Sequence, residues 1–163
     1  DSVASRGLGD VYKRQMFDLA QEKLGVHKPL VVGDRLDTDI AGGVAAGMDT
    51  LHVLTGVSGP RALISAPMKQ RPTFIAEDLR VLNSCAGDFS SLAPAAQGGF
   101  TAEVEQQTAD GVVIVLDGGN ADATWLQALR TVLSVAWSLE GAPTIIDVRS
   151  ASPVAGTAIK AWW

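Results

Sequence analysis

A short, unbroken apolar run, Pro29-Leu30-Val31-Val32-Gly33, is followed at once by an aspartate. Continuous apolar runs of this length are typical of strands buried on both faces, which occur almost only in parallel sheets covered by helices. Asp34 would then lie at the carboxyl end of the strand, the edge where open α/β sheets bind ligands. The run therefore predicts a parallel α/β core with a polar site at one edge of its sheet.

The segments around this run alternate between helical and strand patterns. Apolar residues at three- and four-residue steps indicate helices, and short apolar runs indicate strands. The helices are expected over residues 16–24, 38–46 and 59–65, and the strands over residues 29–33, 50–55 and 73–76. This alternation favours a doubly wound parallel sheet over residues 16–83.

Residues 1–15 show neither a helical nor a strand period. Their ending, DVYKRQ, resembles translated sequencing-adaptor tails, and the chain does not begin with Met. We therefore expect a non-native or disordered tail and exclude it from the fold. A genuine but unstructured N-terminal arm is the alternative.

A second unit is expected after a linker. Residues 84–99 are rich in Ala, Ser, Gly and Pro and lack a sustained period, as linkers do. In the unit that follows, residues 100–163, the Asp110-Gly111 pair predicts a hairpin turn between two strands. The expected elements are strands over residues 100–107 and 112–116, a helix over 121–139 and a strand over 144–148. We expect a small α+β domain.

Composition excludes several classes of partner. Thirteen Lys and Arg against eighteen Asp and Glu give a net charge of -5, which does not favour binding to nucleic acid. The apolar runs are shorter than the ~20 residues that a membrane helix needs. Cys85 is the only cysteine, which fits a reducing compartment, and we expect a cytoplasmic protein.

The segment Leu30–Ile40, LVVGDRLDTDI, places Asp34, Asp37 and Asp39 in one strand-to-helix turn. Like charges at this density repel one another unless a cation lies among them. Carboxylate oxygens are the ligands that Mg²⁺ prefers, so the turn predicts a magnesium site. A solvated acidic turn in another doubly wound domain, such as a flavodoxin-like or receiver module, is the alternative.

The pattern G-D-x-x-x-x-D, between an apolar strand and a Gly/Ala-rich helix that ends in A-A-G-M, resembles the fourth motif of haloacid dehalogenase (HAD) superfamily phosphatases. The version here resembles that of the nitrophenylphosphatase and phosphoglycolate phosphatase subfamily. The resemblance extends from Met16 to about Leu82. Its matching residues are Gly33, Asp34, Arg35, Leu36, Asp37, Thr38, Asp39 and Ile40.

This resemblance implies a Mg²⁺-dependent phosphatase that acts on a small phosphorylated metabolite through an aspartyl-phosphate. Asp34 would bind Mg²⁺ directly, and Asp39 would hold a metal-bound water or orient its neighbours. Asp37 is expected to cap the helix, because carboxylates are favoured at helix N-termini. Gly33, Arg35 and Thr38 would support the motif.

The chain also departs from the family. The family's D-x-D-G nucleophile motif, its second-motif Ser or Thr and its Lys are missing, as is the cap domain. We therefore expect the C-terminal part of a HAD core, assign no catalytic residue, and expect the chain to be inactive alone. The second unit resembles part of an acetyltransferase-like fold, which phosphatases of the glycerol 3-phosphate type carry after the core, and we expect an accessory domain.

A different class of function is compatible with the same residues. The chain would be a complete, non-catalytic binding module, with a structural acidic turn and a second unit that binds a partner or an acyl-coenzyme A. His52 lies on a predicted buried strand and is expected to be a satisfied core histidine rather than a catalyst.

Overall fold

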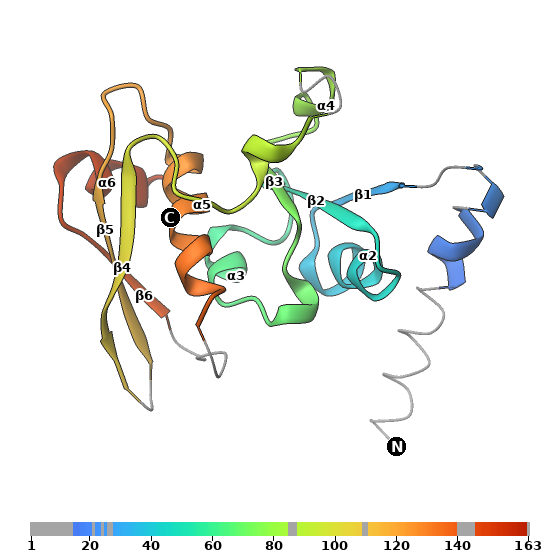
Figure 1. The fold of residues 1–163 in the computed structure, drawn as a ribbon, viewed down its shortest axis with the longest axis horizontal. Helices are drawn as coiled ribbons and strands as arrows, with labels where there is room; N and C mark the ends of the chain where they lie inside the picture. The colour runs from blue at the N-terminus through green and yellow to red at the C-terminus, as the bar shows by residue number, and fades with distance from the viewer. Residues whose placement is uncertain are drawn as a thin grey trace.

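The computed structural model describes residues 15–20, 22–23, 25, 28–84, 88–108, 111–139 and 146–162. These residues form two three-stranded sheets with helices packed between and around them (Figure 1). Residues 15–20 and 22–23 are helical, which agrees with the helix predicted over 16–24, and Gly25 has a left-handed φ of 62°. Residues 1–14 of the predicted tail lie outside the described residues.

The first sheet is parallel throughout, as predicted. Its strand order is β1-β2-β3, and its register pairs Gly33 with His52 and His52 with Ile75. Parallel pairing brings the three carboxyl ends to one edge. The strands are β1 (Leu30–Gly33), β2 (Asp49–Val53) and β3 (Phe74–Ala76).

Short helical segments connect these strands. The helix expected from Thr38 begins two residues earlier, with a π-helical turn that leads directly into α2. Leu36 and Ile40 are both buried, so the wider turn places two apolar side chains four residues apart in the core. The segments are η1 (Leu36–Ile40), α2 (Ala41–Ala45), α3 (Pro60–Ile64), η2 (Met68–Gln70) and α4 (Val81–Ser84).

The second sheet mixes antiparallel and parallel pairing. The predicted hairpin is confirmed, because the first two strands pair antiparallel and Thr108 N donates to Gly111 O across the turn, although residues 109–110 lie outside the described residues. The third strand pairs parallel with the second. The elements are β4 (Phe100–Gln107), β5 (Val112–Gly118), α5 (Trp125–Ala136), β6 (Ile146–Ser150) and α6 (Pro153–Lys160).

Helix α6 is a feature that the sequence patterns did not predict. Ser152 caps it by accepting a hydrogen bond from Ala155 N at 3.1 Å, and Pro153 occupies its first turn. The helix packs against α5 and β5.

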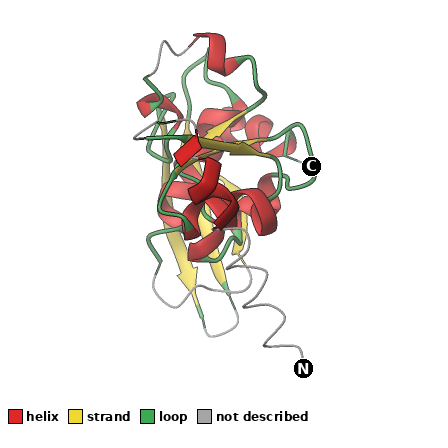
Figure 2. Cartoon of the chain, turned by 90° about the vertical axis from the view of Figure 1, so that its right-hand side faces the viewer, coloured by secondary structure: helices red, strands yellow, loops and turns green. Residues whose placement is uncertain are grey.

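In Figures 1 and 2 the long strands of the second sheet run steeply across those of the first.

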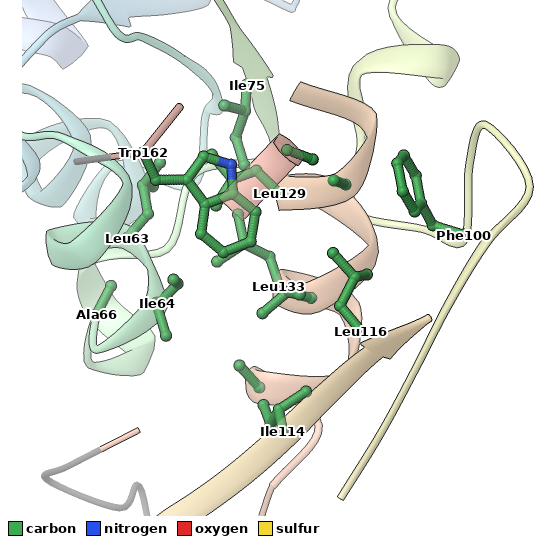
Figure 3. Packing of buried hydrophobic residues seen from close by; sticks show 14 of the residues in the cluster. Leu63, Ile64, Ala66, Ile75, Phe100, Ile114, Leu116, Leu129, Leu133 and Trp162 are labelled. Carbon is green, nitrogen blue, oxygen red and sulfur yellow. The ribbon is translucent and has the colours of Figure 1, made fainter. Parts of the chain in front are cut away.

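Helix α5 joins the two sheets through one core. Residues 128–133 are all buried, so more than one face of this helix is covered. Leu63 and Ile64 of α3 approach it from the first sheet, and Ile114 and Leu116 of β5 approach it from the second (Figure 3). Both units therefore share a single hydrophobic cluster.

The segment predicted as a linker, so far as residues 88–99 are described, packs against the first sheet and bonds to helix α5. Leu92 is buried against β2 and β3, and Gln97 N donates to Thr131 Oγ1 at 3.0 Å. Over residues 88–99 the chain is therefore anchored at the first sheet and at helix α5. No helix in the described parts of the chain is long and apolar enough to span a membrane.

Candidate metal site at the end of β1

Asp34 follows β1 directly and lies at the carboxyl edge of the first sheet, partly exposed. Its Oδ2 accepts a hydrogen bond from Val57 N at 2.9 Å, and its backbone oxygen accepts one from Ser58 N at 3.1 Å. No partner for Oδ1 is found in the part of the chain that the structure describes. The carboxylate is therefore oriented on one side and open to a ligand on the other.

Asp39 lies beside the same strand end. A Cβ atom added at Gly33 would be 2.5 Å from Asp39 Oδ2, so the glycine makes room for this side chain. Asp39 Oδ2 accepts from Arg35 N at 3.2 Å, and Thr38 Oγ1 donates to Asp39 Oδ1 at 3.2 Å. Asp39 thus fixes the turn that follows Asp34.

Asp37 has a different environment from the one predicted. The residue at the start of the helical turn is Arg35, which has no side-chain capping bond, so the expected cap at Asp37 is wrong. Arg35 instead donates to Asp37 through Nε at 3.1 Å and Nη2 at 2.9 Å. This hydrogen bond and the charge of Asp37 raise the pKa of Arg35. The pair is solvent-exposed and compensates one of the three clustered carboxylates.

The β2–α3 loop, Leu54–Gly59, completes the site, and the sequence patterns did not identify its role. Besides the two contacts to Asp34, Ser58 Oγ accepts from Leu36 N at 3.2 Å. Gly56 lies so close to Asp34 that an added Cβ would overlap its carboxylate. The only available signal was the Thr55-Gly56-Val57 sequence directly after a strand.

His52 is fully buried on β2, as predicted, but only one of its ring nitrogens is satisfied. Nε2 lies 2.8 Å from Ser58 O, whereas Nδ1 has no hydrogen-bond partner among the described residues. A carbonyl can only accept, so Nε2 carries the proton. Burial lowers the pKa of His52, which keeps the ring neutral near pH 7.

The site supplies oxygen donors of the kind that hard divalent cations bind, but few of them. Asp34 and Asp39 are the two carboxylates at the strand end that accept hydrogen bonds from backbone amides, whereas Asp37 is ion-paired with the Arg35 guanidinium. Among the described residues, no three Asp, Glu, His or Cys side chains gather in a way that could hold a metal. Mg²⁺ normally takes six oxygen ligands, several of them water. The residues fit a magnesium ion that takes its other ligands from elsewhere.

Sequence comparison assigns the first unit to a known protein family. A profile of the HAD-hydrolase-like family matches residues 13–82, which include β1, β2, β3 and the whole carboxylate site. These residues belong to the HAD-hydrolase-like family. The strand, acidic turn and helix predicted from the sequence all lie within this match.

Two curated relatives of this chain are phosphatases. D-glycerol 3-phosphate phosphatase of Mycobacterium tuberculosis is 41% identical over 118 residues, which cover 69% of this chain and 31% of that protein. Dihydroxyacetone phosphatase of Corynebacterium glutamicum is 32% identical over 97 residues, covering 58% of this chain and 33% of that protein. The chain therefore spans about a third of the length of these relatives.

A solved structure resembles the chain over both sheets. It is the glycerol phosphate phosphatase of Mycobacterium tuberculosis in complex with magnesium, with a TM-score of 0.69 and 34% sequence identity. The match covers 90% of this chain and 40% of that one, so it includes residues of the second unit. The mixed α/β fold with a parallel sheet is therefore shared with a phosphatase, whereas the acetyltransferase-like character of the second unit stays a prediction.

Proposed function

We propose that this chain is the C-terminal portion of a Mg²⁺-dependent phosphatase that hydrolyses small phosphate monoesters, with glycerol 3-phosphate as the leading substrate. The observation that supports this most strongly is the position of Asp34, oriented at the carboxyl end of β1 within the HAD-hydrolase-like span. The phosphatases among its relatives support the same reaction class.

Asp34 and Asp39 have different roles at the proposed metal site. Asp34 offers its open Oδ1 as a ligand, because Oδ2 is engaged by Val57 N. Asp39 is bonded to Arg35 N and Thr38 Oγ1, so it acts by holding the turn and, in this proposal, by binding a metal-bound water. Gly33, Arg35, Asp37 and Thr38 keep the turn in shape. Bound there, Mg²⁺ would neutralise negative charge on phosphoryl oxygens.

The 163-residue polypeptide on its own is expected to be inactive. It holds no D-x-D-G sequence, and among its described residues the carboxylate site lacks a third ligand group. A metal ligand without a positioned nucleophile gives little rate enhancement. Incubation with glycerol 3-phosphate and Mg²⁺ should therefore release no phosphate above the buffer rate, and sustained release would contradict this.

The remaining features of the proposal concern organisation and location. Residues 16–83 would be the hydrolase part and residues 100–163 a small accessory domain, joined by residues 84–99. The lone Cys85 favours the cytoplasm, the acidic composition does not favour nucleic acid as a partner, and the short apolar runs do not favour a membrane.

The metal role is tested by Mg²⁺ titration of the isotope-labelled chain, followed by NMR. Saturable shifts are expected for amides of residues 33–39 and 56–58, and Asp34→Asn should weaken binding by at least about tenfold. Asp37→Asn is the matched control, because it removes the same charge from the same turn and should cause a smaller loss. No Mg²⁺-dependent shift in the wild type would instead support the binding-module alternative.

A further inference from the structure

We propose that His52 is a positioning residue: through Ser58 it holds the β2–α3 loop against Asp34 and fixes the orientation of that carboxylate. The inference rests on the proposed function, in which Asp34 binds Mg²⁺. It assigns a task to a buried imidazole that does not itself reach the reacting groups.

The contacts form a short, continuous path from the core to the metal ligand. His52 Nε2 donates to Ser58 O at 2.8 Å, and the peptide on the other side of Ser58 donates its N–H to Asp34 O at 3.1 Å. The preceding amide, Val57 N, donates to Asp34 Oδ2 at 2.9 Å. The His52 imidazole therefore binds the loop to the core at Ser58 O. Two backbone amides of the same loop, those of Val57 and Ser58, contact Asp34.

The incomplete hydrogen bonding of His52 supports a task of this kind. The ring is fully buried, and its Nδ1 has no partner in the part of the chain that the structure describes. An apolar side chain would avoid the cost of that unpaired nitrogen. His52 pairs with Gly33 in the sheet, so the ring is anchored one residue before Asp34. A histidine at this place gives the loop a donor that leucine or valine lacks.

Gly56 lets the loop backbone pack closely against the Asp34 side chain. A Cβ atom there would overlap the carboxylate of Asp34, so the loop backbone packs directly against that side chain. Gly56 is exposed and its φ lies outside the left-handed region, so alanine is compatible with its backbone. A shift of this loop must therefore move the Asp34 carboxylate. This holds whether the shift follows the loss of the His52 hydrogen bond or a methyl group added at Gly56.

The test compares two buried substitutions two residues apart on the same face of β2. His52→Leu removes the donor to Ser58. The matched control is Thr50→Val, which removes the Oγ1 atom that accepts a hydrogen bond from Thr73 N at 3.0 Å. This bond lies at the end of β2 opposite to His52. Both variants lose one buried hydrogen bond, and both are followed by thermal unfolding, hydrogen exchange of the Val57 amide and Mg²⁺ titration.

His52→Leu should accelerate exchange at Val57 and weaken Mg²⁺ binding by roughly tenfold, whereas Thr50→Val should lower stability alone. His52→Gln keeps a donor nitrogen and should restore most of the affinity. Gly56→Ala, which leaves the core intact, should weaken Mg²⁺ binding with little change in melting temperature, and it serves where His52→Leu does not fold.

The outcomes separate this inference from the proposed function. If the wild type binds Mg²⁺ but His52→Leu binds it equally well, or Thr50→Val loses as much affinity, the positioning role is overturned and the metal site remains. If the wild type shows no Mg²⁺ binding, the proposed function fails and the positioning role fails with it.

Discussion

At residue scale, His52 links the buried interior of the first sheet to solution pH. Burial lowers its pKa below the ordinary value of 6.5 in the folded chain, whereas the unfolded chain keeps that value. Between these two values the unfolded state binds more protons. The stability from the neutral ring is therefore fully present above pH 6.5 and is lost as the pH falls towards the folded pKa.

This predicts a pH dependence that one substitution removes. The free energy of unfolding should fall more steeply between pH 7.5 and pH 5.5 in the wild type than in His52→Gln, which cannot titrate. Urea denaturation at the two pH values measures both slopes, and the carboxylates contribute equally to each. Parallel slopes would show that the imidazole does not resist protonation in the folded chain.

The sequence located Asp34 but not the groups that orient it. A buried strand in a parallel sheet fixes where its carboxyl end lies, so the residue after Gly33 could be placed from the pattern alone. The capping role given to Asp37 was wrong, because its carboxylate is taken by Arg35, an exposed side-chain contact that no periodicity encodes. The contacts of Val57 and Ser58 depend on a loop conformation 20 or more residues away along the chain.

At element scale, α5 is attached to the first sheet through a buried arginine. Arg130 donates through Nε to Ile75 O at 3.1 Å and through Nη1 to Ser91 O at 3.2 Å. A second connection runs through Trp137, whose Nε1 donates to Leu63 O at 3.0 Å and whose backbone oxygen accepts from Arg71 at 2.7 Å. Polar side chains from one unit thus satisfy carbonyls of the other.

Replacing Arg130 should therefore be costly. Arg130→Met retains much of the apolar stem but removes the guanidinium donor of the buried Ile75 carbonyl, and the free energy of unfolding should drop by about 2–3 kcal/mol. Arg149→Met on β6 is the control, since its ion pairs with Glu105 and Asp147 are exposed and should contribute little. Equal losses in urea denaturation would contradict the buried attachment.

Most strands and helix α5 were predictable as elements, with boundaries shifted by a few residues. The Asp110-Gly111 hairpin signal helped to identify β4 and β5, and three- and four-residue spacing identified α5. The π-helical turn at Leu36–Ile40 escaped because it interrupts the 3.6-residue period. Helix α6 escaped because its small residues carry a weak pattern, although Ser152-Pro153 is an N-terminal signature.

At the scale of the whole molecule, two sheets with separate topologies share one core around α5. A linker was expected over residues 84–99. That expectation depended on composition, which does not reveal that Leu92 is buried or that Gln97 bonds Thr131. Long-range packing of this kind is invisible to local patterns.

This packing predicts a single unfolding transition. All four tryptophans lie between residues 125 and 163, so their fluorescence reports on the second unit, while far-UV circular dichroism reports on both sheets. The two probes should give the same urea midpoint, because the shared cluster couples both sheets. Separate midpoints would show that each unit unfolds on its own.

The burial of α5 on more than one face also bears on how such chains are inherited. A module that touches its neighbour through a thin, polar boundary can be exchanged by recombination, because each side keeps its own interior. Here residues 128–133 lie in one interior that both units share, so a foreign replacement would have to match the side chains of both units. The second sheet should accordingly pass between lineages together with the first, and drift in either should select compensating changes along this helix.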